Sequence, residues 1–143
     1  MEKISISKSA KKIQVNDMGE YIIVDARDQD FVAGFLELLQ DFEAKKPEYQ
    51  KRMEEIQNMP CATNDELLAK GLAACRVNKE ICEELKSKVN DIFKEDACRK
   101  IFGNITPSVM AFAEFFEQLS PIVKNAQAEQ YENIKKYTDK YEK

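Results

Sequence analysis

The stretch Asp28-Gln29-Asp30-Phe31-Val32-Ala33-Gly34-Phe35-Leu36-Glu37-Leu38-Leu39-Gln40-Asp41-Phe42 decides the fold class of this chain. Asp28 stands where an N-cap carboxylate would accept hydrogen bonds from a first helical turn. The apolar residues that follow recur at the spacing of one helical face, namely Phe31, Phe35, Leu38, Leu39 and Phe42. A helix is therefore predicted here. Pro47 removes one backbone donor, but Tyr49, Met53 and Ile56 keep the period, so the helix either kinks or restarts at the proline.

A second helix is predicted to begin at Thr63. The pair Thr63 and Glu66 has the spacing of a capping box, in which each side chain bonds the backbone of the other residue. The apolar residues that follow recur every seven positions, with Leu85 and Ile92 in a companion seam: Leu68, Cys75, Cys82 and Val89. This length favours antiparallel packing against the first helix.

Two further helices complete the helical part. A short one covers 97–103, because Gly103 can take the left-handed conformation that closes a helix. Thr106 and Pro107 form a cap followed by a proline at the first helical position, which opens the last helix. Pro121 is predicted to interrupt that helix, and residues 124–143 beyond it form a polar, frayed helical tail.

The N-terminal residues alternate in the manner of strands. Ile4 and Ile6, then Ile13 and Val15, precede the run 21–24, and a turn sequence at 16–19 separates the last two segments. The predicted fold class is α+β, mainly α, with a two- or three-stranded β-hairpin region packed on a bundle of about four helices. The chain of 143 residues is expected to form one domain, 1–143, with a hairpin region 1–26 and a helical core 28–123.

The amino-acid composition limits the kinds of partner that this chain is expected to bind. Lys and Arg number 22 against 26 Asp and Glu, for a net charge of −4, and the lysines are scattered among glutamates. Nucleic-acid binding is therefore disfavoured, because it needs a basic surface. No apolar run reaches the length of a membrane span and the first residues are not a signal peptide, so we expect no membrane partner and a cytoplasmic location.

Candidate chemical sites are few. The chain has no histidine, the commonest general base and a frequent metal ligand, so we expect no enzyme and no catalytic residues. Cys61, Cys75, Cys82 and Cys98 lack zinc-site spacing and are interpreted as small core residues. The acids Asp25, Asp28 and Asp30 lack the pattern of a calcium loop and suit a helix start. No metal or cofactor is predicted, since glycine-rich phosphate loops are also absent.

The last helix carries the candidate partner-binding residues. Its apolar face includes Val109 and Val123 and is unusually wide. The wide part is interpreted either as core, which is the favoured interpretation, or as a partly exposed binding face made by Phe112, Phe115, Phe116, Leu119 and Ile122.

Three segments of the chain, taken together, form a distinctive sequence pattern. They are Phe31 to Leu36, with the pattern Phe-Val-x-Gly-Phe-Leu, then Ala97-Cys98-Arg99-Lys100-Ile101-Phe102-Gly103-Asn104-Ile105-Thr106-Pro107-Ser108, and Phe112-Ala113-Glu114-Phe115-Phe116-Glu117-Gln118-Leu119-Ser120-Pro121. In these segments, and in the order of its elements, the chain resembles tail assembly chaperones of tailed phages and prophages of Gram-positive bacteria. The resemblance covers about half the chain, and Cys61, Cys75 and Cys82 belong to no shared pattern.

The resemblance implies a non-enzymatic role in the bacterial host cytoplasm. Such a protein holds tail tube subunits, the tape measure protein, or both during tail assembly and leaves the finished virion. The aromatic face of the last helix, or an edge of the hairpin, would cover apolar surface on the unassembled partner by helix-in-groove or strand-addition contacts. A structural or adaptor component of a phage particle and another small cytosolic protein-interaction module are the alternatives. The oligomeric state, the identity of the partner and the existence of a longer frameshifted product stay open.

Overall fold

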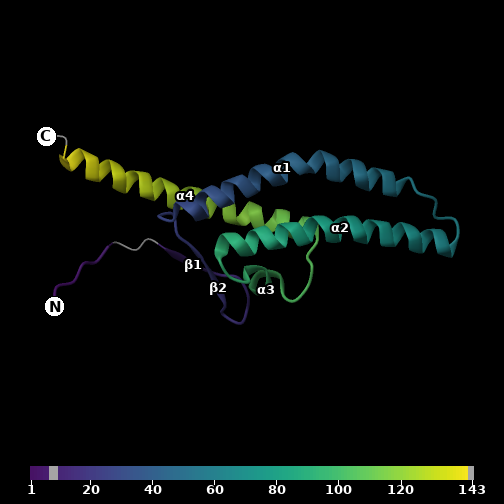
Figure 1. Ribbon diagram of the computed structural model, residues 1–143, viewed down its shortest axis with the longest axis horizontal. Helices are drawn as coiled ribbons and strands as arrows, with labels where there is room; N and C mark the ends of the chain where they lie inside the picture. The colour runs from purple at the N-terminus through teal and green to yellow at the C-terminus, as the bar shows by residue number, and fades with distance from the viewer. Residues whose placement is uncertain (7–9, 142–143) are drawn as a thin grey trace.

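The computed structural model describes residues 1–6 and 10–141. Positions 7–9 of the predicted hairpin region and 142–143 of the predicted tail lie outside the described residues. The elements are strands β1 (Lys11–Gln14) and β2 (Tyr21–Val24), followed by helices α1 (Gln29–Gln57), α2 (Asn64–Phe93), α3 (Ala97–Phe102) and α4 (Val109–Tyr141). The predicted class, α+β and mainly α with an N-terminal hairpin and four helices, is confirmed (Figure 1).

The hairpin has two strands within the described residues. They pair antiparallel, with Ile13 opposite Ile22. Ile22 and Val24 are fully buried on the face of the sheet that packs toward α4, and Ile13 is half-buried beside them. Residues 1–6 form no strand, so Ile4 and Ile6 remain exposed.

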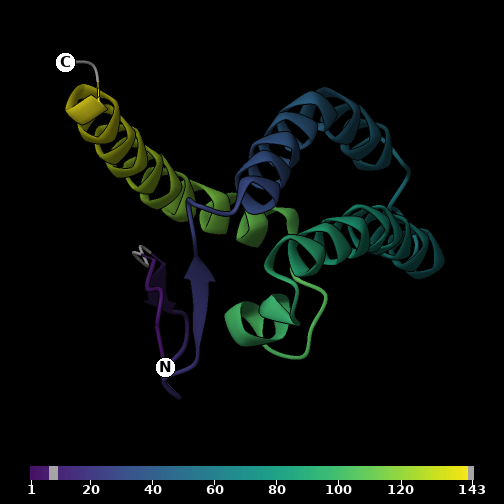
Figure 2. The ribbon, with the colours of Figure 1, turned by 60° about the vertical axis from the view of Figure 1, so that its left-hand side comes forward.

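Helices α1 and α2 form a long antiparallel hairpin (Figure 1). Asp28 caps α1 as predicted, because its carboxylate accepts from the backbone N–H groups of Asp30 and Phe31. The helix continues through Pro47 and curves along its length (Figure 2), as expected where a proline removes one backbone bond. Between the helices, the Tyr49 hydroxyl donates to the Asn78 side-chain oxygen at 2.7 Å.

The cap of α2 differs in one detail from a capping box. The Thr63 hydroxyl accepts from the Glu66 backbone N–H at 3.1 Å, as predicted. The same hydroxyl donates to the Glu66 carboxylate at 3.2 Å. The carboxylate is therefore held by the hydroxyl, where a full capping box would use the Thr63 backbone N–H.

Helix α4 differs from the prediction at both prolines. It begins at Val109, two residues after Pro107, and the Ser108 hydroxyl accepts from the Ala111 backbone N–H at 3.2 Å. It also runs through Pro121 without interruption. The missing proline N–H costs one bond to the Glu117 carbonyl, whereas burial of the apolar face on either side stabilises the continuous helix. Burial of the apolar face of α4 therefore outweighs the helix-breaking effect of Pro121.

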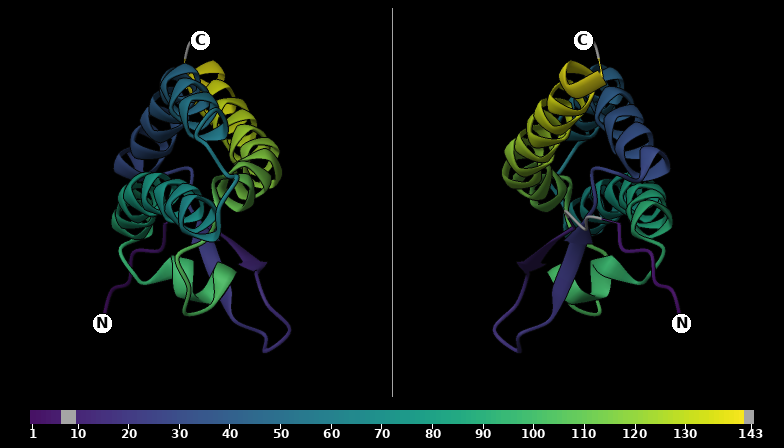
Figure 3. Two further views of the ribbon diagram at one scale, coloured as in Figure 1. Left: turned by 90° about the vertical axis from the view of Figure 1, so that its right-hand side faces the viewer. Right: turned by 90° about the vertical axis from the view of Figure 1, so that its left-hand side faces the viewer.

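One core joins the hairpin to the helices. Its buried residues come from β2, α1, the second half of α2, α3 and α4, and include Phe35, Val89, Cys98, Phe112 and Val123. In end view, α1, α2 and α4 surround this core, with the hairpin and α3 on one side (Figure 3). The first half of α2 and the connection that precedes it extend beyond the core, so Cys75 in the helix and Cys61 in the connection are exposed. Their interpretation as core residues is wrong. Cys82 and Cys98 are buried as predicted.

Two helical glycines give a matched stability test. A Cβ added at Gly71 in α2 meets no atom within 4 Å, whereas one added at Gly34 in α1 meets the Ile92 side chain at 3.2 Å. Because glycine in a helix costs about 0.5–1 kcal/mol relative to alanine, we expect Gly71→Ala to raise the free energy of unfolding by that amount. Gly34→Ala should gain less or lose stability. Urea denaturation of both variants measures the difference, and an equal gain would contradict the close packing at Gly34.

Candidate functional site

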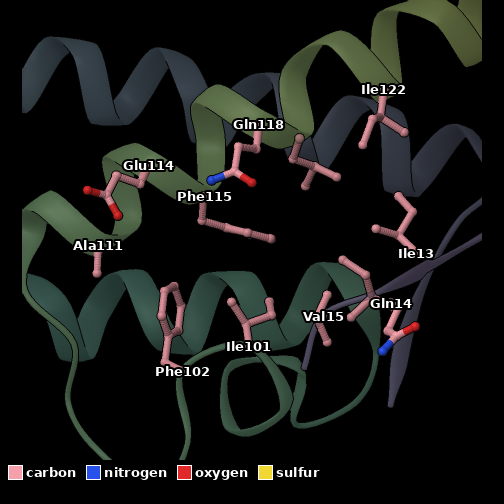
Figure 4. Close-up of a pocket in the computed structure, with 12 residues that line it drawn as sticks. Ile13, Gln14, Val15, Ile101, Phe102, Ala111, Glu114, Phe115, Gln118 and Ile122 are labelled. Carbon is pink, nitrogen blue, oxygen red and sulfur yellow. The ribbon is translucent and has the colours of Figure 1, made fainter. Parts of the chain in front are cut away.

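An apolar groove lies between the hairpin, α3 and α4. It encloses about 370 Å³ and is lined by Ile13, Gln14, Val15, Ile22, Ile101, Phe102, Ala111, Glu114, Phe115, Gln118, Leu119 and Ile122. Figure 4 shows Phe115 projecting from α4 into this space, with Ile101 and Phe102 of α3 on the opposite side. The groove thus has an apolar centre and a polar rim made by Gln14, Glu114 and Gln118.

Polar contacts hold the hairpin against α3 beside this groove. Arg99 of α3 pairs with Glu20 at 3.0 Å, and Lys100 donates to the Tyr21 carbonyl at 3.2 Å. The Asn16 side-chain amide in the turn donates to the Lys100 carbonyl at 3.0 Å. The Arg99 guanidinium lowers the pKa of the Glu20 carboxyl below its ordinary value. This ion pair, together with the Lys100 and Asn16 hydrogen bonds, joins the hairpin to α3.

Aromatic rings form the inner wall of the groove. The Phe102 ring centroid lies 5.0 Å from that of Phe112 and 6.0 Å from that of Phe115. Phe112 is fully buried beneath the groove, while Phe102 and Phe115 are half-buried and line it. Edge and tilted contacts of this kind stabilise ring clusters beyond their burial alone. The wall should therefore keep its shape when the groove is empty.

The structure divides the five predicted partner-binding residues into two sets. Phe112, Phe116 and Leu119 are at most 3% exposed and belong to the core, although Leu119 also borders the groove. Phe115 and Ile122 are half-buried and line the groove. The core interpretation thus accounts for the first set, and the second set offers apolar surface to a partner.

Several groove residues were not named as binding residues from the sequence, although an edge of the hairpin was predicted as a possible binding surface. Ile13 and Val15 come from the hairpin, and Ile101 and Phe102 come from α3. The alternation at 13–15 and the unusually apolar end of the short helix were the available signals. Neither signal shows that the two segments face each other, because they lie more than 80 residues apart in sequence.

The groove is lined mainly by apolar side chains. Among the described residues, no group of three or more His, Cys, Asp or Glu side chains could hold a metal ion. The acids near the start of α1 have structural contacts, since Asp25 pairs with Arg27 at 2.8 Å and Asp28 caps the helix. The Arg27 side chain lowers the pKa of the Asp25 carboxyl. Within the groove, Glu114 supplies the ionisable side chain, and it lies at the rim.

No helix in the described part of the chain is both long and apolar enough to span a membrane. Comparisons with protein-family models, with curated proteins and with solved structures found no match to this chain.

Proposed function

We propose that this chain is a non-enzymatic binding protein whose groove holds an apolar segment of an unassembled partner protein. The observation that carries the proposal is the open apolar groove beside β1, the outer strand of the hairpin. Its apolar centre and polar rim match the anatomy of a protein interface. A small molecule fits less well, because the polar groups lie at the rim and do not converge on one bound group.

Strand addition is the mode of binding that suits this geometry. Within the described residues β1 pairs with β2 alone, so its other edge offers backbone donors and acceptors. A partner strand added there would place every second side chain toward the groove face that Ile13 occupies. The groove would then select apolar residues at alternate positions, and main-chain bonds would supply affinity with little dependence on sequence.

We propose further that the partner is a tail tube protein, a tape measure protein, or both, and that this chain is a tail assembly chaperone in the cytoplasm of a bacterial host. Support comes from the resemblance carried by residues 97–108 and 112–121. These two segments supply α3 and the part of α4 that line the groove. A chaperone of this kind covers apolar surface that the partner later buries in the assembled tail.

The groove predicts a specific loss of binding. Phe115→Glu should weaken partner binding at least tenfold, because it places a charge among apolar side chains. Gln118→Trp should weaken binding similarly by filling the groove, and Gln118 is exposed, so the core is unaffected. Met110→Glu is the control, since Met110 is 68% exposed on α4 and does not line the groove. Thermal denaturation identifies the variants that remain folded.

The measurement is co-purification with the tail tube and tape measure proteins of the phage or prophage that encodes the chain. Recovery of neither protein by the wild type would refute the chaperone role. Folded groove variants that bind like the wild type would refute the groove as the site. Mass spectrometry of purified virions completes the test, because a chaperone should be absent and a structural component of the particle should be present.

A further inference from the structure

Residues 1–6, which we call the arm, carry exposed apolar side chains at alternate positions. Ile4 and Ile6 are 89% and 75% exposed, and Ser5 lies between them. Alternation of this kind is typical of a strand that has one face covered. The arm forms no strand, however, and extends away from the hairpin (Figures 1 and 3). The described part of the chain therefore leaves uncovered two isoleucines whose spacing suits a strand.

The open edge of β1 offers main-chain partners for such a strand. The Val15 N–H donates to the Glu20 carbonyl at 3.0 Å. Ile13 lies opposite Ile22 in the same register. Because bonded pairs alternate along two antiparallel strands, Ile13 and Val15 bond toward β2, and Gln14 between them directs its N–H and C=O outward. The outer edge of β1 therefore presents one donor and one acceptor at Gln14.

The groove side of the same edge matches the spacing of the arm. Ile13, in β1, and Val15, directly after it, both line the groove. Residues directly opposite each other in paired strands point to the same face of the sheet. An antiparallel strand that places Ile6 opposite Ile13 therefore places Ile4 opposite Val15, so that both isoleucines enter the groove. A shift by one residue would turn both to the exposed face of the hairpin.

We infer that the arm of one copy adds as an antiparallel strand to the edge of β1 in a second copy, with Ile4 and Ile6 in that copy's groove. The Ser5 backbone then pairs with the outward N–H and C=O of Gln14. A second copy is the occupant because the arm leaves the edge of its own β1 open (Figures 1 and 3). In addition, the sequence at 7–10, Ser-Lys-Ser-Ala, contains none of the Gly, Asn or Asp residues that a two-residue hairpin turn favours. Reciprocal exchange uses both arms and both grooves, which closes a twofold dimer.

The test measures self-association of the full chain by sedimentation velocity. The wild type should form a dimer whose fraction rises with concentration. The arm variant, Ile4→Glu with Ile6→Glu, should raise the dimer dissociation constant at least tenfold, because it places carboxylates against apolar side chains. Both of its positions are exposed, so the fold should be retained. Gln14→Pro should also weaken the dimer by removing the outward N–H, whereas Gln14→Ala, the matched control, should dimerise like the wild type.

Mixing two variants tests the contact between arm and groove directly. Phe115→Glu keeps an intact arm and the arm variant keeps an intact groove, so an equimolar mixture should associate more tightly than either variant alone. Gln118→Trp takes the place of Phe115→Glu if circular dichroism shows that the latter is unfolded. A wild type that stays monomeric up to millimolar concentration would overturn the inference. A dimer that the arm variant leaves unchanged would overturn it too, as would a mixture that associates no better than its components.

The arm enters the same groove as the partner segment of the proposed function, so the two should compete, an expectation that rests on that function. Adding purified tail tube or tape measure protein should convert the dimer into a complex that holds one copy of this chain. A complex that retains the dimer would contradict a shared groove. A monomeric wild type that still binds a tail protein would overturn the arm exchange alone, and a dimer that binds neither tail protein would overturn the chaperone role alone.

Discussion

Replacing Phe112 by alanine should destabilise this protein by about 3–5 kcal/mol, the range measured when buried aromatic side chains are truncated. Phe112 is fully buried, and its ring centroid lies 5.0 Å from that of Phe102 and 6.1 Å from that of Phe116. It thus links α4 to α3 beneath the groove. Because a domain of this size is typically stable by only about 5–15 kcal/mol, the variant should be close to unfolding at physiological temperature.

The measurement is chemical denaturation followed by circular dichroism. Met110→Ala on the same helix is the matched control, since Met110 is 68% exposed, and its effect should stay within about 0.5 kcal/mol. The groove gives a second readout, because loss of the Phe112 ring removes support from Phe102, which lines the groove. A loss below about 1 kcal/mol for Phe112→Ala would contradict the packing of α4 described above.

The helices could be predicted because local spacing and burial agree in them. Phe31, Phe35, Leu38 and Phe42 recur at helical period and all are buried. Asp28, Thr63 and Gly103 mark helix ends by side-chain or backbone properties that act within a few residues. Signals of this kind need no knowledge of distant contacts.

The sequence could not show that the first part of α2 is exposed, and the cause is physical. The seven-residue repeat that begins at Leu68 and Cys75 has the same form as the part at Cys82 and Val89, yet only the latter part is buried. Burial depends on how far α3 and α4 extend along α2, and no local pattern records that distance.

The groove required tertiary information as well. Phe115 and Phe116 are neighbours in one apolar run, but Phe116 is buried in the core and Phe115 lines the groove. The difference arises because the hairpin and α3, held together by Asn16, Glu20 and Arg99, stop short of covering Phe115. A single sequence shows a wide apolar face and leaves open which part of it the rest of the chain covers.

Alkaline pH should destabilise this protein strongly through its two buried thiols. Burial raises the pKa of Cys82 to about 11 and that of Cys98 to about 12, from an ordinary value of 9.0. The Cys98 thiol also donates to the Lys86 carbonyl at 3.7 Å, which favours the protonated form. Above pH 9 the unfolded chain therefore loses protons that the folded chain retains, so the unfolded state gains stability as the pH rises.

The sign of the effect follows from which state binds more protons. Well below pH 9, the ordinary thiol pKa, both thiols are protonated in both states, and the free energy of unfolding does not depend on them. Between pH 9 and the folded pKa values, each thiol lowers the free energy of unfolding by about 1.4 kcal/mol per pH unit. At pH 10 the two together should cost roughly 3 kcal/mol. Urea denaturation at pH 8, 9 and 10 measures this loss.

Lysine and tyrosine side chains also titrate near pH 10, so the contribution of the thiols has to be isolated by comparison. The double variant Cys82→Ala, Cys98→Ala starts from a lower stability because it leaves small cavities, but it should lose much less than the wild type between pH 8 and pH 10. Cys61→Ala, Cys75→Ala is the matched control, since both of its thiols are exposed, and it should follow the wild type. Equal losses in all three proteins would show that the buried thiols do not control the alkaline limit, because removal of an ionisable group must remove its share of the pH dependence.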